Sequence, residues 1–267
     1  MRRVAALVGK ELADQRQNLM LFLPVVIVAV VAIVMPIVVA VVVPAVAGEK
    51  LSDSSDFEVA LEMYRTQPEV RGLDPEGAIQ AFIFQYFLLI FTLIPITCAM
   101  SVAAYGIVGE KQARSLEPLL ATPLTTTELL AAKVLGALLP SLALTLLCMA
   151  IYLVTIFFVA RPGVMLAMLG PRSLGIVFLL GPLAALAALQ MAVCVSSRVN
   201  DARTAQQIGV TVILPIVGLF IGQIAGVFTL TAPVIGLISL ALVAFNLVLM
   251  IVAIRIFDRE TILTRWK

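Results

Sequence analysis

The residue types that most often carry chemistry are scarce in this chain. It contains no histidine, and Cys98, Cys148 and Cys194 each stand alone inside an apolar run. Without histidine there is no base for a serine hydrolase or a zinc protease and no pair of axial haem ligands. The isolated cysteines lack the paired spacing of a disulfide framework or a zinc site. We therefore expect no catalytic centre, no metal and no cofactor on this chain.

The remaining candidates are neutral polar side chains in apolar surroundings. Gln85, Gln190, Gln223 and Asn246 fall inside long uncharged stretches. At membrane depth such a side chain must face protein or a cavity, because lipid offers it no hydrogen-bond partner. These four residues are candidates to line a pathway, and hydrogen bonding between helices explains them equally well.

The uncharged stretches predict an all-α, polytopic membrane protein. The longest, from Thr204 to Ile254, covers 51 residues without Asp, Glu, Lys or Arg, and hydrophobic residues make up 62% of the chain. Ordinary soluble domains have about 45–50%. One helical pass through a bilayer needs about 20 apolar residues, so the longest stretch is long enough for two passes. Thr229, Thr231 and Pro233 sit where a tight reversal would divide it.

We predict one membrane domain over residues 1–267, built as a bundle of six transmembrane helices. The predicted passes lie near residues 20–46, 81–108, 134–160, 174–196, 207–228 and 232–254. Ala45, Val46 and Ala47 imitate a signal-peptidase site, but the preceding apolar run is about twice a signal-peptide core, so we expect the first pass to be retained. Residues 47–80 should form an extracytoplasmic loop. The short run from Val164 to Leu169 should rest at the outer interface.

The loop charges predict the orientation. With six passes both termini share one side, which holds 13 of the 18 basic residues, while Lys50, Arg65, Arg71, Arg161 and Arg172 lie on the other. Basic residues are retained on the cytoplasmic side, so we expect cytoplasmic termini in the cell (inner or plasma) membrane. The net charge is only +2, and the basic residues are spread among loops and not gathered in one patch. We therefore expect lipid and protein partners and no nucleic acid.

The segment before the first pass has an apolar face. Val4, Leu7, Val8 and Leu12 share one side of a helix, with Arg3, Lys10 and Asp14 away from it. We expect an interfacial helix over residues 1–18 along the cytoplasmic leaflet. A mobile basic tail that only sets the topology is the alternative.

The cytoplasmic segment 109–133 carries strong local signals. Thr125 stands three residues before Glu128, the spacing of a capping box in which each side chain bonds the other residue's backbone N–H. Leu124 and Leu129 complete a hydrophobic staple. A second short helix should begin near Ser115, because Pro118 is tolerated in a first turn. We therefore expect two capped helices that form a rigid cytoplasmic projection. On physical grounds alone, this segment could equally well be a simple connection between two passes.

Three stretches resemble the permease subunits of type 2 ABC transporters, in particular a sodium-exporter-like branch. One is the run from Glu110 to Lys133, in which Leu116-Glu117, Leu119-Leu120-Ala121-Thr122-Pro123 and Glu128-Leu129 match; Arg114-Ser115 replaces the usual Gly-Thr pair, and Pro118 is atypical. The second lies at the junction of the fourth and fifth helices, and the third is at the C-terminal end. The matching residues of these two are Ser196, Ser197, Arg198, Asp201, Arg203, Ala205, Gln206, Gln207 and Pro215, and then Arg255, Phe257, Arg259 and Glu260.

This resemblance implies an ATP-driven export system. Two permease subunits, identical or paralogous, would form the pathway, and two separate ABC ATPase subunits would dock beneath them. The chain itself has no phosphate-binding loop of the G-x-x-x-x-G-K-[ST] type, so we expect ATP to bind the partner and this subunit not to be an enzyme. The resemblance assigns ATPase coupling, through a coupling helix, to one set of residues: Glu110, Lys111, Ser115, Glu117, Thr125 and Glu128.

A passive channel, or a membrane scaffold or assembly protein without ATPase coupling, is the alternative function, because backbone and hydroxyl groups alone can line a pore. In the fifth pass Gly218, Gly222 and Gly226 recur every four residues and leave one helix face bare for close helix packing. That face could serve the bundle itself, a second subunit or a moving helix. The cargo is not encoded in any pattern that the sequence displays.

Overall fold

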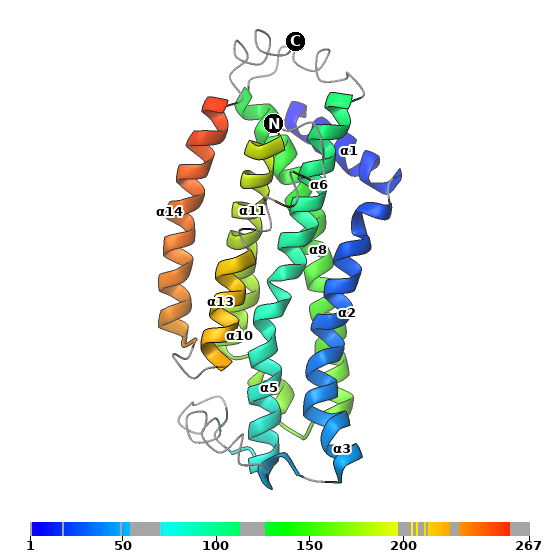
Figure 1. The fold of residues 1–267 in the computed structure, drawn as a ribbon, viewed down its shortest axis with the longest axis vertical. Helices are drawn as coiled ribbons and strands as arrows, with labels where there is room; N and C mark the ends of the chain where they lie inside the picture. The colour runs from blue at the N-terminus through cyan, green and yellow to red at the C-terminus, as the bar shows by residue number, and fades with distance from the viewer. Residues whose placement is uncertain are drawn as a thin grey trace.

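The computed structural model describes residues 2–17, 19–48, 50–53, 70, 72–112, 126–196, 204, 207, 211, 213–224 and 230–256, and every element within them is helical. Long helices run side by side along the molecule (Figure 1). Five are long and apolar enough to cross a membrane: Leu23–Ala47, Pro75–Gly106, Glu128–Val159, Pro171–Val195 and Ala232–Ile254. The predicted all-helical, multi-pass architecture is confirmed, and the sixth pass depends on a shorter helix described below.

The N-terminal helix α1 (Arg2–Gln17) lies across one end of the bundle (Figure 1). The chain then turns through η1 (Leu19–Phe22) into the first long apolar helix. This consists of α2 (Leu23–Ile37), the π-helical segment η2 (Val38–Val42) and α3 (Val43–Ala47), and it agrees with the predicted pass over 20–46. Gly48, with a φ of 70°, ends it in the left-handed conformation that favours glycine.

The second long helix begins earlier than the expected residue 81. It starts at α5 (Pro75–Phe91), because Asp74 caps it by accepting a hydrogen bond from the Gly77 amide at 3.2 Å and Pro75 occupies its first turn. The predicted loop over 47–80 was therefore too long, and the connection lies within residues 48–74; its middle part lies outside the described residues, apart from η3 (Leu51–Asp53) and isolated positions. Thr92 separates α5 from α6 (Leu93–Gln112).

The third long helix, α8, runs without interruption from Thr126 to Val159. It begins directly after Thr125, the expected cap, which lies outside the described residues. This start agrees with the helix predicted from the capping box, and the second short helix predicted near Ser115 lies outside the described residues. Leucine and alanine dominate residues 129–138, so no polar break divides the cytoplasmic end of α8 from its membrane-spanning part.

A helical hairpin follows α8, formed by α9 (Val164–Ala167) and α10 (Pro171–Gly175). Gly163, with a φ of 90°, begins it. We expected this run to rest at the outer interface, but Val164, Ala167 and Met168 are buried in the main core cluster. Small and flexible side chains let the hairpin fit inward, while Leu166 on its other side is 74% exposed. The chain continues through η6 (Ile176–Leu180) into α11 (Gly181–Ser196).

The last two helices share the longest uncharged stretch. The first, α13 (Ile213–Ile224), spans only 12 described residues, and the second, α14 (Ala232–Ile256), is a full-length helix. Thr231 is non-helical and accepts a hydrogen bond from the Ile235 amide at 3.0 Å, so α14 starts where the reversal was predicted. The expected bounds of the fifth pass, 207–228, include residues outside the described part of the chain.

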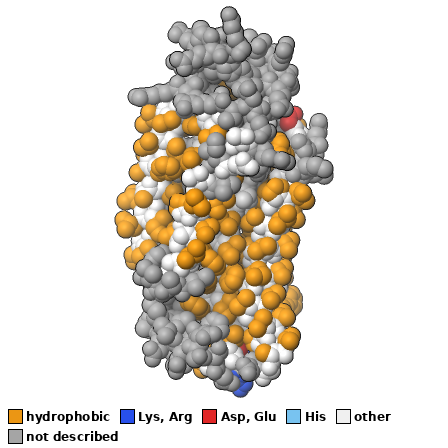
Figure 2. Space-filling model, viewed as in Figure 1, with side chains coloured by type: hydrophobic (Ala, Val, Ile, Leu, Met, Phe, Trp, Pro, Cys, Tyr) orange, Lys and Arg blue, Asp and Glu red, His pale blue; other side chains and the backbone are white. Residues whose placement is uncertain are grey.

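The core is divided along the bundle. One buried cluster gathers around α5 and the hairpin, with Phe84, Phe91 and Tyr152 among its largest members, and a second gathers where α6, α11 and the start of α8 meet. The second long helix, formed by α5 and α6, is the central one. In its most apolar stretch 78% of the residues are buried, against 17% in that of α14. Hydrophobic side chains cover the described flank of the molecule over most of its length (Figure 2). A soluble protein rarely exposes such a surface, and lipid accounts for it.

Candidate functional site: the junction of α1 with α8

The junction forms where α1 lies against the first turns of α8, near the end of α6 (Figure 1). The apolar face predicted for the first helix is confirmed, since Val4, Leu7, Val8 and Leu12 are all partly buried. On the outer side, Lys10 forms an exposed ion pair with Asp14 at 3.9 Å. The helix therefore uses its apolar face to pack against the bundle.

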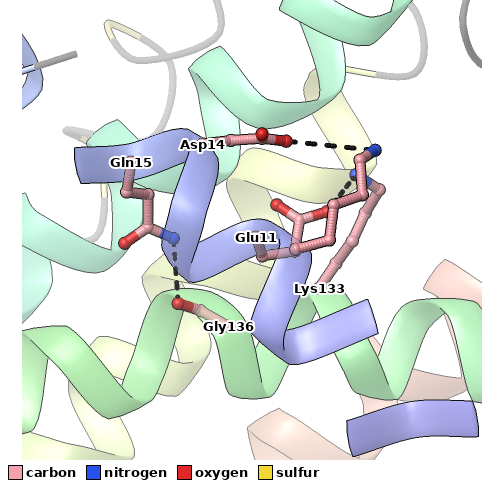
Figure 3. A network of polar contacts seen from close by, with 6 residues as sticks. Glu11, Asp14, Gln15, Lys133 and Gly136 are labelled. Carbon is pink, nitrogen blue, oxygen red and sulfur yellow. Dashed lines mark hydrogen bonds and ion pairs between the residues drawn. The ribbon is translucent and has the colours of Figure 1, made fainter. Parts of the chain in front are cut away.

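Two charged residues meet inside this contact. Lys133 Nζ lies 3.0 Å from Glu11 Oε1, and the two side chains are only 6% and 14% exposed (Figure 3). They line a small cleft together with Val102, Ala103, Gly106, Ala137 and Val193. In such apolar surroundings each charge needs the other, because an unpaired buried charge is costly. The pair therefore specifies how α1 sits on α8.

Gly136 lets the two helices approach closely. A Cβ atom at this position would lie 2.9 Å from Glu11 Cβ, a distance that real Cβ atoms do not tolerate. Pro140, four residues later in α8, has no N–H to donate to the Gly136 carbonyl, and Gln15 Nε2 donates a hydrogen bond to this oxygen instead, at 3.0 Å (Figure 3). Gln15 is itself buried. Two polar contacts and one close backbone approach thus fasten α1 to α8.

Three of the six residues expected to couple to an ATPase belong to described helices at this end of the bundle. Glu110 and Lys111 belong to the last turn of α6, and Glu128 lies in the first turn of α8, one and a half turns before Lys133. Ser115, Glu117 and Thr125 lie outside the described residues. Both ends of the predicted coupling segment therefore emerge from helices that pack against each other, and one of these helices carries α1.

Sequence reasoning missed Glu11 and Gln15. The signal was present, because both fall at helical spacing on the apolar face formed by Val8 and Leu12. A glutamate on an otherwise apolar helix face predicts a cationic side chain as its buried partner. Lys133 lies among leucine and alanine residues in the sequence, which is the matching signal for a buried charge. In the sequence it stands out only as a residue of the family motif.

Three of the four candidate pathway residues bond backbone carbonyls or amides of neighbouring elements. Gln85 is 1% exposed, and its Nε2 donates to the Ala167 carbonyl of the hairpin at 2.7 Å. Asn246 Nδ2 donates to the Leu183 carbonyl of α11 at 3.0 Å. The Gln223 carboxamide is satisfied when its oxygen faces two donors, and in that orientation Oε1 accepts from Arg172 Nη2 at 3.0 Å and from the Leu230 amide at 3.3 Å. These contacts join helices, which is the second of the two roles that the sequence left open.

Gln190 differs from the other three. It is 5% exposed on α11, and within the described residues its Oε1 has no hydrogen-bond partner. Among the four, it is the side chain that helix-to-helix hydrogen bonding explains least.

The glycine series of the fifth pass does not pack inside the bundle at Gly218. A Cβ atom there would meet nothing within 4 Å. Gly222 is partly buried, and Gly226 lies outside the described residues. The close-packing role predicted for this face thus stays a prediction, and at Gly218 no described residue supplies the packing partner.

The long apolar helices and the small polar junction at one end define a multi-pass membrane protein. In the part of the chain that the structure describes, no three His, Cys, Asp or Glu side chains gather as metal ligands. The family model described as ABC-2 family transporter protein matches residues 5–242, and the chain belongs to this family. The match supports a permease component of an ABC transporter. No curated protein and no solved structure matches the chain.

Proposed function

We propose that this chain is the permease subunit of an ATP-driven export system in the cell membrane, with both termini in the cytoplasm. Family membership supports a permease that associates with an ABC ATPase. The 13 to 5 distribution of basic residues supports the orientation, in which the α1–α8 junction faces the cytoplasm. Two ATPase subunits would supply the energy.

The observation that carries this proposal is the continuity of α8. Force applied to segment 113–125 by an ATPase would reach Thr126, the first residue of a 34-residue helix that continues through the membrane. The Glu11–Lys133 pair and the Gln15–Gly136 bond would carry α1 along with it. Rigid-body movement of this unit would bias the bundle between inward-open and outward-open states.

Affinity purification from native membranes tests the partnership. We expect an ABC ATPase to co-purify with the wild-type chain, and Glu110→Ala or Glu128→Ala to reduce its recovery or its coupled hydrolysis. Lys10→Ala is the matched control, since Lys10 is exposed on the opposite side of α1. Recovery of a correctly inserted wild-type chain without any ATPase would instead favour a passive channel or scaffold.

We further propose that a second permease subunit, identical or paralogous, completes the pathway. The exposed side of α13 supports this, because a Cβ atom at Gly218 would meet no described residue within 4 Å and Leu214 and Ile221 beside it are 63% and 57% exposed. A bare glycine face in an apolar helix suits the close approach of another transmembrane helix.

A further inference from the structure

Helix α13 is attached to the bundle along one side. The Phe220 ring packs on the rings of Tyr86 and Phe87, with centroids 5.0 and 5.9 Å apart, and the Tyr86 hydroxyl donates to the Phe220 carbonyl at 2.7 Å. The opposite side is exposed at Val217 and Ile221. Since α5 supplies both aromatic partners, α13 rests mainly on α5.

A second attachment lies at the C-terminal end of α13. Gln223 Oε1 accepts one hydrogen bond from Arg172 Nη2 and one from the Leu230 amide. Arg172 belongs to α10 and is 5% exposed. One carboxamide therefore joins three segments: the end of α13, the connection before α14 at Leu230, and the hairpin formed by α9 and α10.

The hairpin itself is fixed to α5. Gln85 Nε2 donates to the Ala167 carbonyl at 2.7 Å, and Gln80 Oε1 accepts from the Arg161 amide at 2.9 Å. Val164 and Met168 are fully buried between the helices. The hairpin is therefore held in place against α5. Helix α13 is joined to the hairpin by a hydrogen bond from the Arg172 guanidinium, and such a bond is stronger than one between neutral groups.

We propose that the Arg172–Gln223 contact is a latch that holds α13 closed against α5 at the extracytoplasmic end of the pathway. The proposal rests on the proposed function for the orientation and for the existence of a pathway. Opening would take the Gln223 carboxamide oxygen away from its donors. Because lipid cannot satisfy this carboxamide, we expect water to enter the seam between α13 and α5 as the latch opens.

Water in the seam can be measured through a cysteine thiol, because N-ethylmaleimide reacts with thiolates, which form in water and not in lipid. The parent variant would carry Leu219→Cys, on the bundle-facing side of α13, with Cys98, Cys148 and Cys194 replaced by alanine. Labelling would be followed in native membranes with the full-length chain. Ile221→Cys, on the exposed side of the same helix, is the matched control.

We expect Gln223→Leu to speed labelling of the Leu219→Cys reporter roughly tenfold, the equilibrium factor of one hydrogen bond to a charged group. Gln223→Glu should slow it below the parent rate, because the carboxylate accepts the same bond and adds an opposite charge. Tyr86→Phe should speed it, since it removes the other polar tie while keeping the ring. The Ile221→Cys control should label at one rate in every background.

Labelling at the parent rate in Gln223→Leu would overturn the latch, and so would faster labelling in Gln223→Glu. If Gln223→Leu fails to fold, judged by thermal unfolding in detergent, Gln223→Glu decides the question. The assay requires no ATPase and no cargo. Failure of the proposed function would appear instead as the absence of an ATPase from the affinity purification.

Discussion

Glu11 and Lys133 lie 122 positions apart in the chain and form a 3.0 Å ion pair that is almost wholly shielded from solvent. The pair joins the N-terminal helix to the helix that leads out of the segment expected to meet an ATPase. A nearly buried ion pair of this kind fixes geometry more than it adds stability, because desolvation offsets much of the attraction.

Breaking this pair from one side should be costly. Glu11→Leu or Lys133→Met alone should lower the free energy of unfolding by about 3–5 kcal/mol, because each removes one member of a nearly buried ion pair and keeps the other charge. The double variant should recover most of that loss. Thermal unfolding in detergent would show the pattern, and a double variant as unstable as the sum of the two singles would contradict it.

The exposed ion pair on the same helix is the matched control. Lys10 and Asp14 are 3.9 Å apart and 44% and 59% exposed. Asp14→Asn should change the free energy of unfolding by less than about 0.5 kcal/mol, because solvent screens such pairs.

Gly136→Ala should loosen α1. Its Cβ would lie 2.9 Å from Glu11 Cβ, so the helices must move apart, at a cost of about 1–3 kcal/mol. Limited proteolysis of α1 and thermal unfolding would both report the change. Gly9→Ala, on α1 with no atom within 4 Å, should be neutral or stabilising by up to about 1 kcal/mol. Equal effects of the two substitutions would show that the close approach at Gly136 does not matter.

Two of the buried glutamines, Gln85 and Gln190, should respond differently to substitution by leucine. Gln85→Leu removes the donor to the Ala167 carbonyl and should cost about 1–3 kcal/mol. Gln190→Leu should be neutral or stabilising, because its Oε1 has no partner among the described residues. If Gln190 lines the pathway, the same substitution should lower cargo-stimulated ATP hydrolysis in the purified complex. A stable Gln190→Leu variant with unchanged stimulation would remove it from the pathway.

Gly218→Leu tests the second permease. The position has open space around it in this chain, so the stability of the subunit should not fall. If a second subunit packs on this face, the leucine should reduce the dimer fraction at least about fivefold, measured by light scattering or by cross-linking in membranes. Gly236→Ala, on α14 and also without neighbours within 4 Å, is the control. An unchanged dimer in Gly218→Leu would place the interface elsewhere.

The membrane architecture could be predicted because lipid imposes it on composition: charges are excluded from a pass, so charge-free windows mark the helices. Helix ends depended on local chemistry. Thr231 precedes α14 at the predicted reversal. Asp74 and Pro75, an equally clear cap and first turn, start α5 at residue 75, so the loop predicted to reach residue 80 is too long.

The candidate site was harder to predict because it depends on pairing between distant segments. Lys133 was visible as a motif residue, but its partner Glu11 is defined only once α1 folds onto α8. The hairpin was misplaced for a related reason. Val164 and Met168 suit an interface or a core equally, and only the glutamines of α5, which bond its backbone, decide in favour of the core.

Thr92 divides the central helix at a place with mechanical meaning. Its amide bonds the Leu89 carbonyl at 3.1 Å, and Pro95, three residues later, has no amide hydrogen to offer the preceding turn. The central helix is therefore less resistant to bending near its middle, between α5, which contacts the hairpin, and α6, which packs on α8 and α11. Thr92 and Pro95 form a hinge, so a small tilt of α6 need not rotate α5.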